Sequence, residues 1–197
     1  MIIGGGPAGL ACALTLHAAL GKPGVPADLV ITVLDAGHTD LQSAELWNVP
    51  GIPLGTSGTE HWKTMKSQLG ETSVQVISGQ AVGVKGEAPT FTVTLESGLN
   101  IDANVVVIAT GYKHFDLRFE PEVVLLTNLF SPKTRTSLAL SAPCLVRPGL
   151  YACGNIAGLH SMLSIAMGSG TETACRILSE LAGHVMLVHD VPGGHRL

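Results

Sequence analysis

Residues 1–20 read MIIGGGPAGLACALTLHAAL, and this stretch decides the fold. Three apolar residues precede a run of glycines, and the segment from Leu10 to Leu20 is rich in alanine and leucine without an internal helix breaker. This order is typical of a strand, a tight turn and a helix. Three residues are few for a central strand, so we expect that the natural start lies upstream of Met1 or that part of this edge is missing.

Three glycines form a G-x-G-x-x-G fingerprint between the expected strand and helix. Gly4 allows the tight turn, Gly6 lets a pyrophosphate approach the backbone, and Gly9 lets the helix pack closely against the strand. The run from Leu29 to Leu34 reads as a second strand and ends in Asp35, whose carboxylate could accept hydrogen bonds from an adenosine ribose. The pattern predicts a dinucleotide site in an α/β fold, with an ordinary glycine-rich turn as the alternative.

The rest of the chain reads as short strands and two further helices, separated by two long segments with little regular structure. We expect loops over 36–60 and 113–149 (with a possible strand over 123–126), helices over 61–69 and 164–181, an antiparallel hairpin or meander over 74–96, and strands over 105–108 and 150–153. The strand over 105–108 is fully apolar, which is typical of a buried strand. We expect the tail, 192–197, to fray.

The composition excludes several classes of protein. At 197 residues the chain fits one domain, and 46% hydrophobic against 13% charged residues argues against disorder. A net charge of -4, with 11 basic residues scattered singly, excludes binding to nucleic acid or to an anionic membrane surface. No apolar run approaches the roughly 20 residues of a spanning helix, and no signal peptide opens the sequence, so we expect a soluble, cytoplasmic protein.

The four cysteines, Cys12, Cys144, Cys153 and Cys175, are widely spaced and form no C-x-x-C motif. This spacing argues against a zinc site and against a self-contained redox dithiol. We therefore expect no metal site, and we interpret the cysteines as small, buried apolar side chains.

Four segments stand out in order along the chain: GGGPAGL at 4–10, NVPG at 48–51, ATG at 109–111 and PGLYACGN at 148–155. Together they resemble the FAD domain of the thioredoxin reductase-like flavoproteins, which are pyridine nucleotide-disulfide oxidoreductases. The likeness runs from Ile2 to about Leu181. It implies an α/β, Rossmann-like, three-layer fold that binds FAD and has a central parallel sheet and an antiparallel β-meander.

The resemblance also implies which residues bind FAD. In chain order they are Gly4, Gly6, Pro7, Ala8, Gly9, Asp35, Ala36, Asn48, Ala81, Thr110, Gly111, Gly154, Asn155, Ser164 and Ile165. Asp35 would bind the adenosine ribose, the backbone of Ala81 would meet the adenine, and Thr110 with Gly111 would pack beside the cofactor.

The remaining residues of this set would serve the flavin end. Asn48 would lie near the isoalloxazine, and Gly154 with Asn155 would hold the ribityl or pyrophosphate region. The amides of Ser164 and Ile165 would face the flavin O2 at a helix start, where the helix dipole stabilises negative charge. The family usually has Asp at the position of Asn155, so this chain keeps a hydrogen-bonding group there but lacks a charge.

One part of the family pattern is missing from this sequence. Thioredoxin reductases carry an inserted NADPH domain with a reactive C-x-x-C, whereas only 36 residues separate Tyr112 from Gly149 here and contain no second glycine fingerprint. We expect residues 1–191 to form a single FAD-binding domain whose halves, 1–112 and 113–191, join without that insertion.

Three functions remain open. The first is a FAD-dependent oxidoreductase that is reduced by an external donor and acts with a redox partner protein or a small-molecule substrate. The second is a non-catalytic or electron-transfer flavin module of a larger assembly, and the third is an NAD-binding domain of another class. His160, just before the last helix, is a candidate for proton transfer, with an ordinary loop histidine as the alternative. The resemblance further implies a homodimer.

Overall fold

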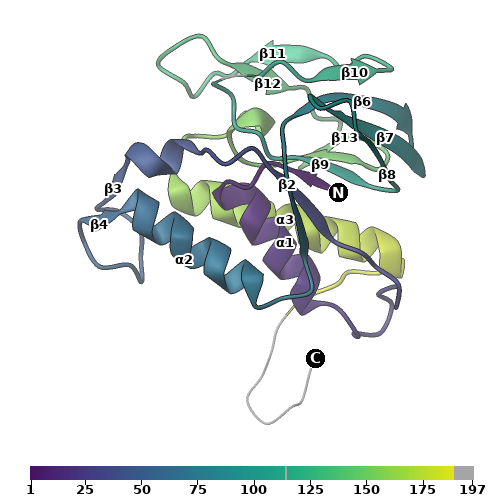
Figure 1. The fold of residues 1–197 in the computed structure, drawn as a ribbon, viewed down its shortest axis with the longest axis horizontal. Coiled ribbons are helices and arrows are strands. Elements are labelled where there is room, and N and C mark those ends of the chain that lie inside the picture. Colours follow the sequence, from purple (N-terminus) through teal and green to yellow (C-terminus); the bar gives the residue numbers. More distant parts are fainter. Residues whose placement is uncertain (114, 189–197) are drawn as a thin grey trace.

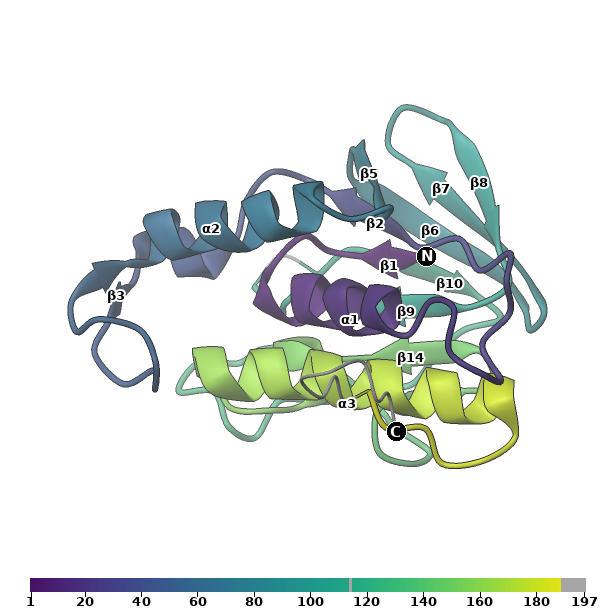
Figure 2. The ribbon, with the colours of Figure 1, turned by 90° about the horizontal axis from the view of Figure 1, so that it is seen from below.

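The computed structural model describes residues 1–113 and 115–188. Its central layer is a six-stranded sheet in the order β13-β14-β9-β1-β2-β5, whose strands lie behind the helices in Figure 2. Five strands are parallel, and only β13 at one edge is antiparallel to its neighbour. The strands are β1 (Ile2–Ile3), β2 (Thr32–Asp35), β5 (Gln75–Ser78), β9 (Val106–Ile108), β13 (Leu145–Arg147) and β14 (Leu150–Ala152).

Three helices cover one face of this sheet: α1 (Pro7–Ala18), α2 (Gly58–Gly70) and α3 (Leu163–Ala182) (Figures 1 and 2). Successive side chains of a strand point to opposite faces. Ile2, Val33 and Val107 accordingly share a core with the helices. The predicted helices at 61–69 and 164–181 are confirmed, with α2 beginning three residues earlier than expected.

A four-stranded sheet covers the other face, in the order β10-β6-β7-β8. Its strands are β6 (Ala81–Glu87), β7 (Thr90–Leu95), β8 (Asn100–Ala103) and β10 (Arg118–Glu120), with β6, β7 and β8 forming an antiparallel meander. Ile3, Leu34 and Ile108 point into the second core, where they meet Phe91 and Val93 of the meander. The predicted three-layer α/β fold, with a parallel central sheet and an antiparallel meander, is thus confirmed.

Three local predictions are wrong in detail. The start of the 74–96 segment, β5, is not part of the hairpin but pairs with β2 in the main sheet. The segment over 113–149 is less irregular than expected, because it contains β10, β11 (Leu125–Thr127), β12 (Thr136–Leu138) and β13, of which only β11 overlaps the possible strand expected over 123–126. The 36–60 loop folds into a 3₁₀ helix, η1 (Asp40–Ser43), and two short paired strands, β3 (Glu45–Leu46) and β4 (Thr56–Ser57).

The remaining sequence predictions about the chain's extent stay predictions. The expected tail, 192–197, lies outside the described residues, as does the end of the expected domain at 191. Within the described part of the chain, no helix combines the length and the apolar character that crossing a membrane requires.

Candidate functional site

The five parallel strands end at one edge of the central sheet, and a cavity of about 370 Å³ lies there. Ile3 ends β1, Leu34 precedes the end of β2, Ala109 follows β9, and Cys153 follows β14; all four line the cavity. Ligands of open α/β sheets bind outside the carboxyl ends of the strands. The topology alone therefore marks this cavity as the candidate site.

The glycine loop forms one wall of the cavity and leaves no room for side chains. A Cβ on Gly4, whose φ is +126°, would lie 2.3 Å from the carbonyl oxygen of Ala109. A Cβ on Gly9 would lie 2.0 Å from the carbonyl oxygen of Gly4, so Gly9 permits the close approach of α1 to β1. These contacts fit the roles that the fingerprint predicts for Gly4 and Gly9, and the role of Gly6 stays a prediction.

The first turn of α1 offers free amide groups to the cavity. Gly6 is the N-cap, and the first intrahelical bond runs from the amide of Leu10 to the carbonyl of Gly6. The amides before Leu10 have no acceptor within the helix, and the positive end of the helix dipole is here. A helix start of this kind is an anion site, suited to a phosphate.

The cavity brings together most of the residues that the sequence proposes. Its lining includes Gly4, Gly6, Pro7, Ala8, Ala36, Asn48, Ala81, Thr110, Gly111, Gly154 and Asn155. Gly9, Asp35, Ser164 and Ile165 are not in the lining. The individual binding roles proposed for these residues stay predictions.

Asp35 lies behind the loop rather than in the cavity wall. Its carboxylate is only 7% exposed and accepts hydrogen bonds from the amide of Gly37, at 2.8 Å, and from the Nζ of Lys66, at 3.0 Å. A carboxylate can accept about four hydrogen bonds, so these two contacts leave acceptor capacity for a ribose hydroxyl.

The last helix presents its first turn to the cavity, close to the predicted position. α3 begins at Leu163, and its first intrahelical bond joins the amide of Ala166 to the carbonyl of Met162. Met162, Leu163 and Ala166 line the cavity, together with Ser161. The amides of Ser164 and Ile165 belong to this first turn and have no intrahelical acceptor, although their side chains are exposed.

Asn155 contributes a buried acceptor without a partner. Its Nδ2 donates to the Oγ of Ser161 at 3.3 Å, whereas its Oδ1 is buried and accepts no hydrogen bond from the residues that the structure describes. Buried polar atoms are rarely left unpaired, because the lost hydrogen bond costs about 1–3 kcal/mol. Since Asn155 lines the cavity, a ligand hydroxyl is a suitable donor to this oxygen.

His160 stands apart from this arrangement. It is exposed, it is not in the cavity lining, and its ring stacks on that of Phe130 with centroids 4.1 Å apart. A role in proton transfer stays a prediction, and the stacking contact supports the alternative of an ordinary loop histidine.

Sequence reasoning missed two features at the cavity. Lys113 and Asp40 both line it and form an ion pair, with Nζ and Oδ1 2.8 Å apart, that joins the segment after Gly111 to η1. Thr39 lines it next to Gly6 and caps η1. A signal for the Thr39 cap was present in the sequence, because Thr39 and Gln42 have the spacing of a capping box.

The surroundings of Cys12 and Cys153 disfavour the thiolate, which is the reactive form of a cysteine. Burial raises the pKa of Cys12 to about 12 and that of Cys153 well above its ordinary value. Both thiols are fully buried, which confirms the interpretation of these two residues as core side chains. Cys144 and Cys175 are half-buried, and all four cysteines are free.

Residues 1–122 match the family model described as "Pyridine nucleotide-disulphide oxidoreductase". A thioredoxin reductase from Streptomyces coelicolor is 32% identical to this chain over 125 residues. That alignment covers 64% of this chain and 38% of the relative, so the chain spans well under half the length of this curated protein.

Solved structures show the same fold. A thioredoxin reductase from Gloeobacter violaceus matches with a TM-score of 0.73 at 15% identity, over 96% of this chain and 97% of that chain. A ferredoxin-flavin thioredoxin reductase from Clostridium acetobutylicum matches with a TM-score of 0.68 at 15% identity, over 92% and 97%.

Proposed function

Because the chain belongs to the pyridine nucleotide-disulphide oxidoreductase family, we propose that it is a FAD-binding oxidoreductase that receives its electrons from an external donor or partner protein. The observation that carries this proposal is the cavity at the ends of the parallel strands, where the glycine loop, Asn155 and the start of α3 meet.

The residues of the cavity fit FAD in two independent ways. The glycine loop presents its backbone to the cavity, since Gly4, Gly5 and Gly6 line it without side chains, and a closely approaching pyrophosphate requires such a bare backbone. The buried Oδ1 of Asn155 has no hydrogen-bond donor in the part of the chain that the structure describes, so it can accept from a ligand hydroxyl. The ribityl chain and the ribose of FAD both carry hydroxyls.

In this proposal the residues of the chain bind and orient the cofactor. The amides at the start of α1 hold the pyrophosphate, and Asn155 fixes a hydroxyl beside Gly154. The amides at the start of α3 offer partial positive charge to the flavin ring. FAD, when bound, supplies hydride and single-electron chemistry, while the protein supplies orientation and electrostatics.

An external donor is proposed because the sequence between Tyr112 and Gly149 has no second glycine fingerprint. The donor is a pyridine nucleotide or a reduced partner protein. The second kind of donor is illustrated by the ferredoxin-flavin thioredoxin reductase from Clostridium acetobutylicum, whose name pairs ferredoxin with flavin. A homodimer and a cytoplasmic location are further proposals that rest on the family resemblance.

A non-catalytic or electron-transfer flavin module is the second candidate. The position of His160 outside the cavity favours it, because the one proton-transfer candidate from the sequence is then not placed to act on a bound ligand. The absence of a C-x-x-C from the sequence favours it too.

One experiment separates these possibilities. The purified protein is examined by absorbance spectroscopy, before and after incubation with FAD, and is then titrated anaerobically with NADPH, NADH and dithiothreitol. Bound flavin that is bleached by one of these donors supports the oxidoreductase. Bound flavin that only photoreduction bleaches supports the electron-transfer module, and a chain that takes up NADH but no FAD contradicts both.

A further inference from the structure

Helix α2 contacts the glycine loop through side chains that do not line the cavity. Trp62 is buried, at 7% exposure, and its Nε1 donates a hydrogen bond to the carbonyl oxygen of Gly5 at 2.8 Å. This bond joins residues that are 57 positions apart in the sequence, and the indole satisfies a backbone carbonyl of the loop.

Lys66 lies one helical turn after Trp62 and reaches the same place. Its Nζ is 3.0 Å from Oδ2 of Asp35 and 4.4 Å from the centroid of the Trp62 ring. Asp35 in turn packs directly against the loop, since a Cβ on Gly5 would lie 2.4 Å from the Asp35 Cγ. Trp62, Lys66 and Asp35 thus form a cluster in contact with Gly5.

Helix α2, which carries Trp62 and Lys66, packs tightly against its neighbours. A Cβ on Gly58, the first residue of α2, would lie 1.9 Å from the carbonyl oxygen of Leu41, so the helix start touches η1. Met65 and Leu69 anchor the buried face of the helix in the core. The hydrogen bond and the ion pair therefore extend from a fixed support.

We infer that Trp62 and Lys66 are positioning residues of the dinucleotide site: Trp62 fixes the backbone of the glycine loop, and Lys66 neutralises Asp35 behind it. This inference rests on the proposed binding of FAD and deepens it. It assigns to α2, which the fingerprint does not include, a share in the recognition of the pyrophosphate.

The charge argument concerns the buried carboxylate. A pyrophosphate on the loop carries negative charge, and Asp35, at 7% exposure, would repel it if the carboxylate had no cation beside it. Lys66, 41% exposed, supplies that cation while staying in contact with water. Its contribution to stability is therefore small, as for other partly exposed pairs, and its main effect falls on anion binding.

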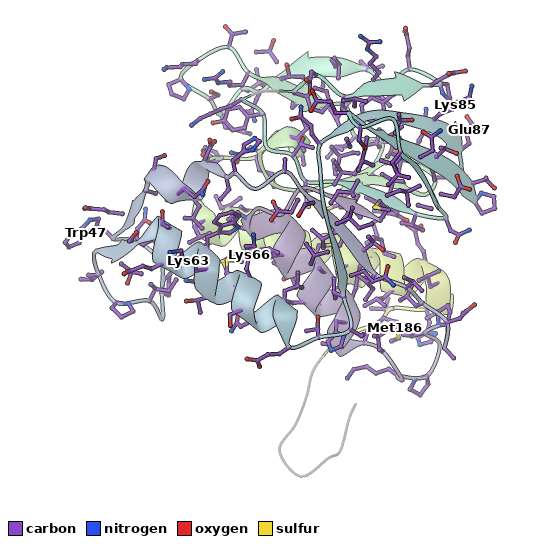
Figure 3. All side chains as sticks on the ribbon, viewed as in Figure 1. Trp47, Lys63, Lys66, Lys85, Glu87 and Met186 are labelled. Atoms are coloured by element: carbon purple, nitrogen blue, oxygen red, sulfur yellow. The ribbon has the colours of Figure 1, made fainter. Side chains whose placement is uncertain are left out.

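The test uses ADP, which has the pyrophosphate, and adenosine, which lacks it, as probes of the whole chain by equilibrium titration. Lys66→Met is expected to weaken ADP binding roughly tenfold and adenosine binding much less. Trp62→Phe is expected to weaken ADP binding about fivefold, because the Gly5 carbonyl loses its donor. Lys63→Met is the matched control, since Lys63 is an exposed lysine on the same helix (Figure 3).

Rescue distinguishes the proposed charge effect from a general loss of structure. Lys66→Arg keeps a cation beside Asp35 and is expected to hold ADP affinity within about threefold of the wild type. Thermal melts of each variant report whether the fold is kept.

The experiment distinguishes failure of the proposed function from failure of the inference about Trp62 and Lys66. A wild type that binds neither FAD nor ADP overturns the proposed function itself. A wild type that binds both, with Lys66→Met and Trp62→Phe binding ADP as tightly, overturns only the inference. An equal loss of ADP and adenosine binding in Lys66→Met, or a loss of ADP binding in Lys66→Arg as large as in Lys66→Met, also overturns it.

Discussion

At the scale of single residues, Asn155 carries a cost in the free protein that a ligand would remove. Among residues 1–113 and 115–188, its buried Oδ1 has no donor, and its Nδ2 has a 3.3 Å contact to Ser161. Leucine has nearly the same shape and no polar atom. We therefore predict that Asn155→Leu raises the stability of the apoprotein by about 1 kcal/mol and weakens FAD binding roughly tenfold.

This prediction is specific because replacing Asn155 is expected to improve one property, the stability of the apoprotein, and to worsen another, the affinity for FAD. A residue that only supports the fold would lose stability and affinity together when it is replaced. Urea unfolding of the apoprotein and a fluorescence titration with FAD measure the two effects. Ser161→Ala removes the Nδ2 contact alone and serves as the comparison; a destabilised Asn155→Leu apoprotein would contradict the interpretation of Oδ1 as an unpaired atom.

Among secondary-structure elements, the contact between α1 and α3 depends on a glycine that faces the other helix. A Cβ on Gly170 would lie 2.0 Å from the carbonyl oxygen of Ala8, whereas a Cβ on Gly168 would have no atom within 4 Å. Gly170→Ala is expected to lower the unfolding free energy by about 1–3 kcal/mol, because the helices must separate. Gly168→Ala is expected to raise it by up to ~1 kcal/mol through helix propensity.

Thermal melts of the two variants and the wild type check this pair. Because both changes add one methyl group to the same helix, propensity cancels between them and only the contact with α1 differs. Melting temperatures that rise equally in both variants would show that α1 and α3 do not approach each other as closely at Ala8.

The elements also show where sequence patterns are informative and where they are not. α1 and β9 were predictable, since each has a long apolar pattern or a motif at its end. β5 was not assigned to its sheet, because its four residues fit either an antiparallel hairpin or an edge of the parallel sheet, and only tertiary pairing with β2 decides. β12 has three residues, too few for a periodic pattern, whereas the equally short β11 overlaps the possible strand expected over 123–126.

The residues of the candidate site also fall into those that sequence patterns predict and those that they do not. Residues in the motifs after β1, β9 and β14 were predictable because the carboxyl ends of parallel strands meet at one edge. Trp62 and Lys66 were not, because their partners are 57 and 31 positions distant and no local pattern records such contacts. Their spacing by four on an amphipathic helix indicates only a shared face.

For the whole molecule, the central sheet separates two hydrophobic cores, one on its helix side and one on its meander side. Two thiols buried in the helix-side core make the unfolding free energy depend on pH. Cys12 and Cys153 are fully buried there, and burial raises the pKa of Cys12 to about 12 and that of Cys153 well above its ordinary value. The folded chain therefore keeps both thiols protonated at a pH where the unfolded chain has released the protons.

The sign of the effect follows from this difference. Above pH 9, near the ordinary pKa of a thiol, the unfolded state binds fewer protons than the folded state, so the unfolding free energy falls as pH rises. We predict a loss of about 1 kcal/mol for each of the two thiols by pH 10, with little dependence on these groups below pH 8. Urea unfolding under reducing conditions between pH 7 and 10 measures it. In Cys12→Ala the slope above pH 9 should be shallower; an unchanged slope would place the titrating groups elsewhere in the molecule.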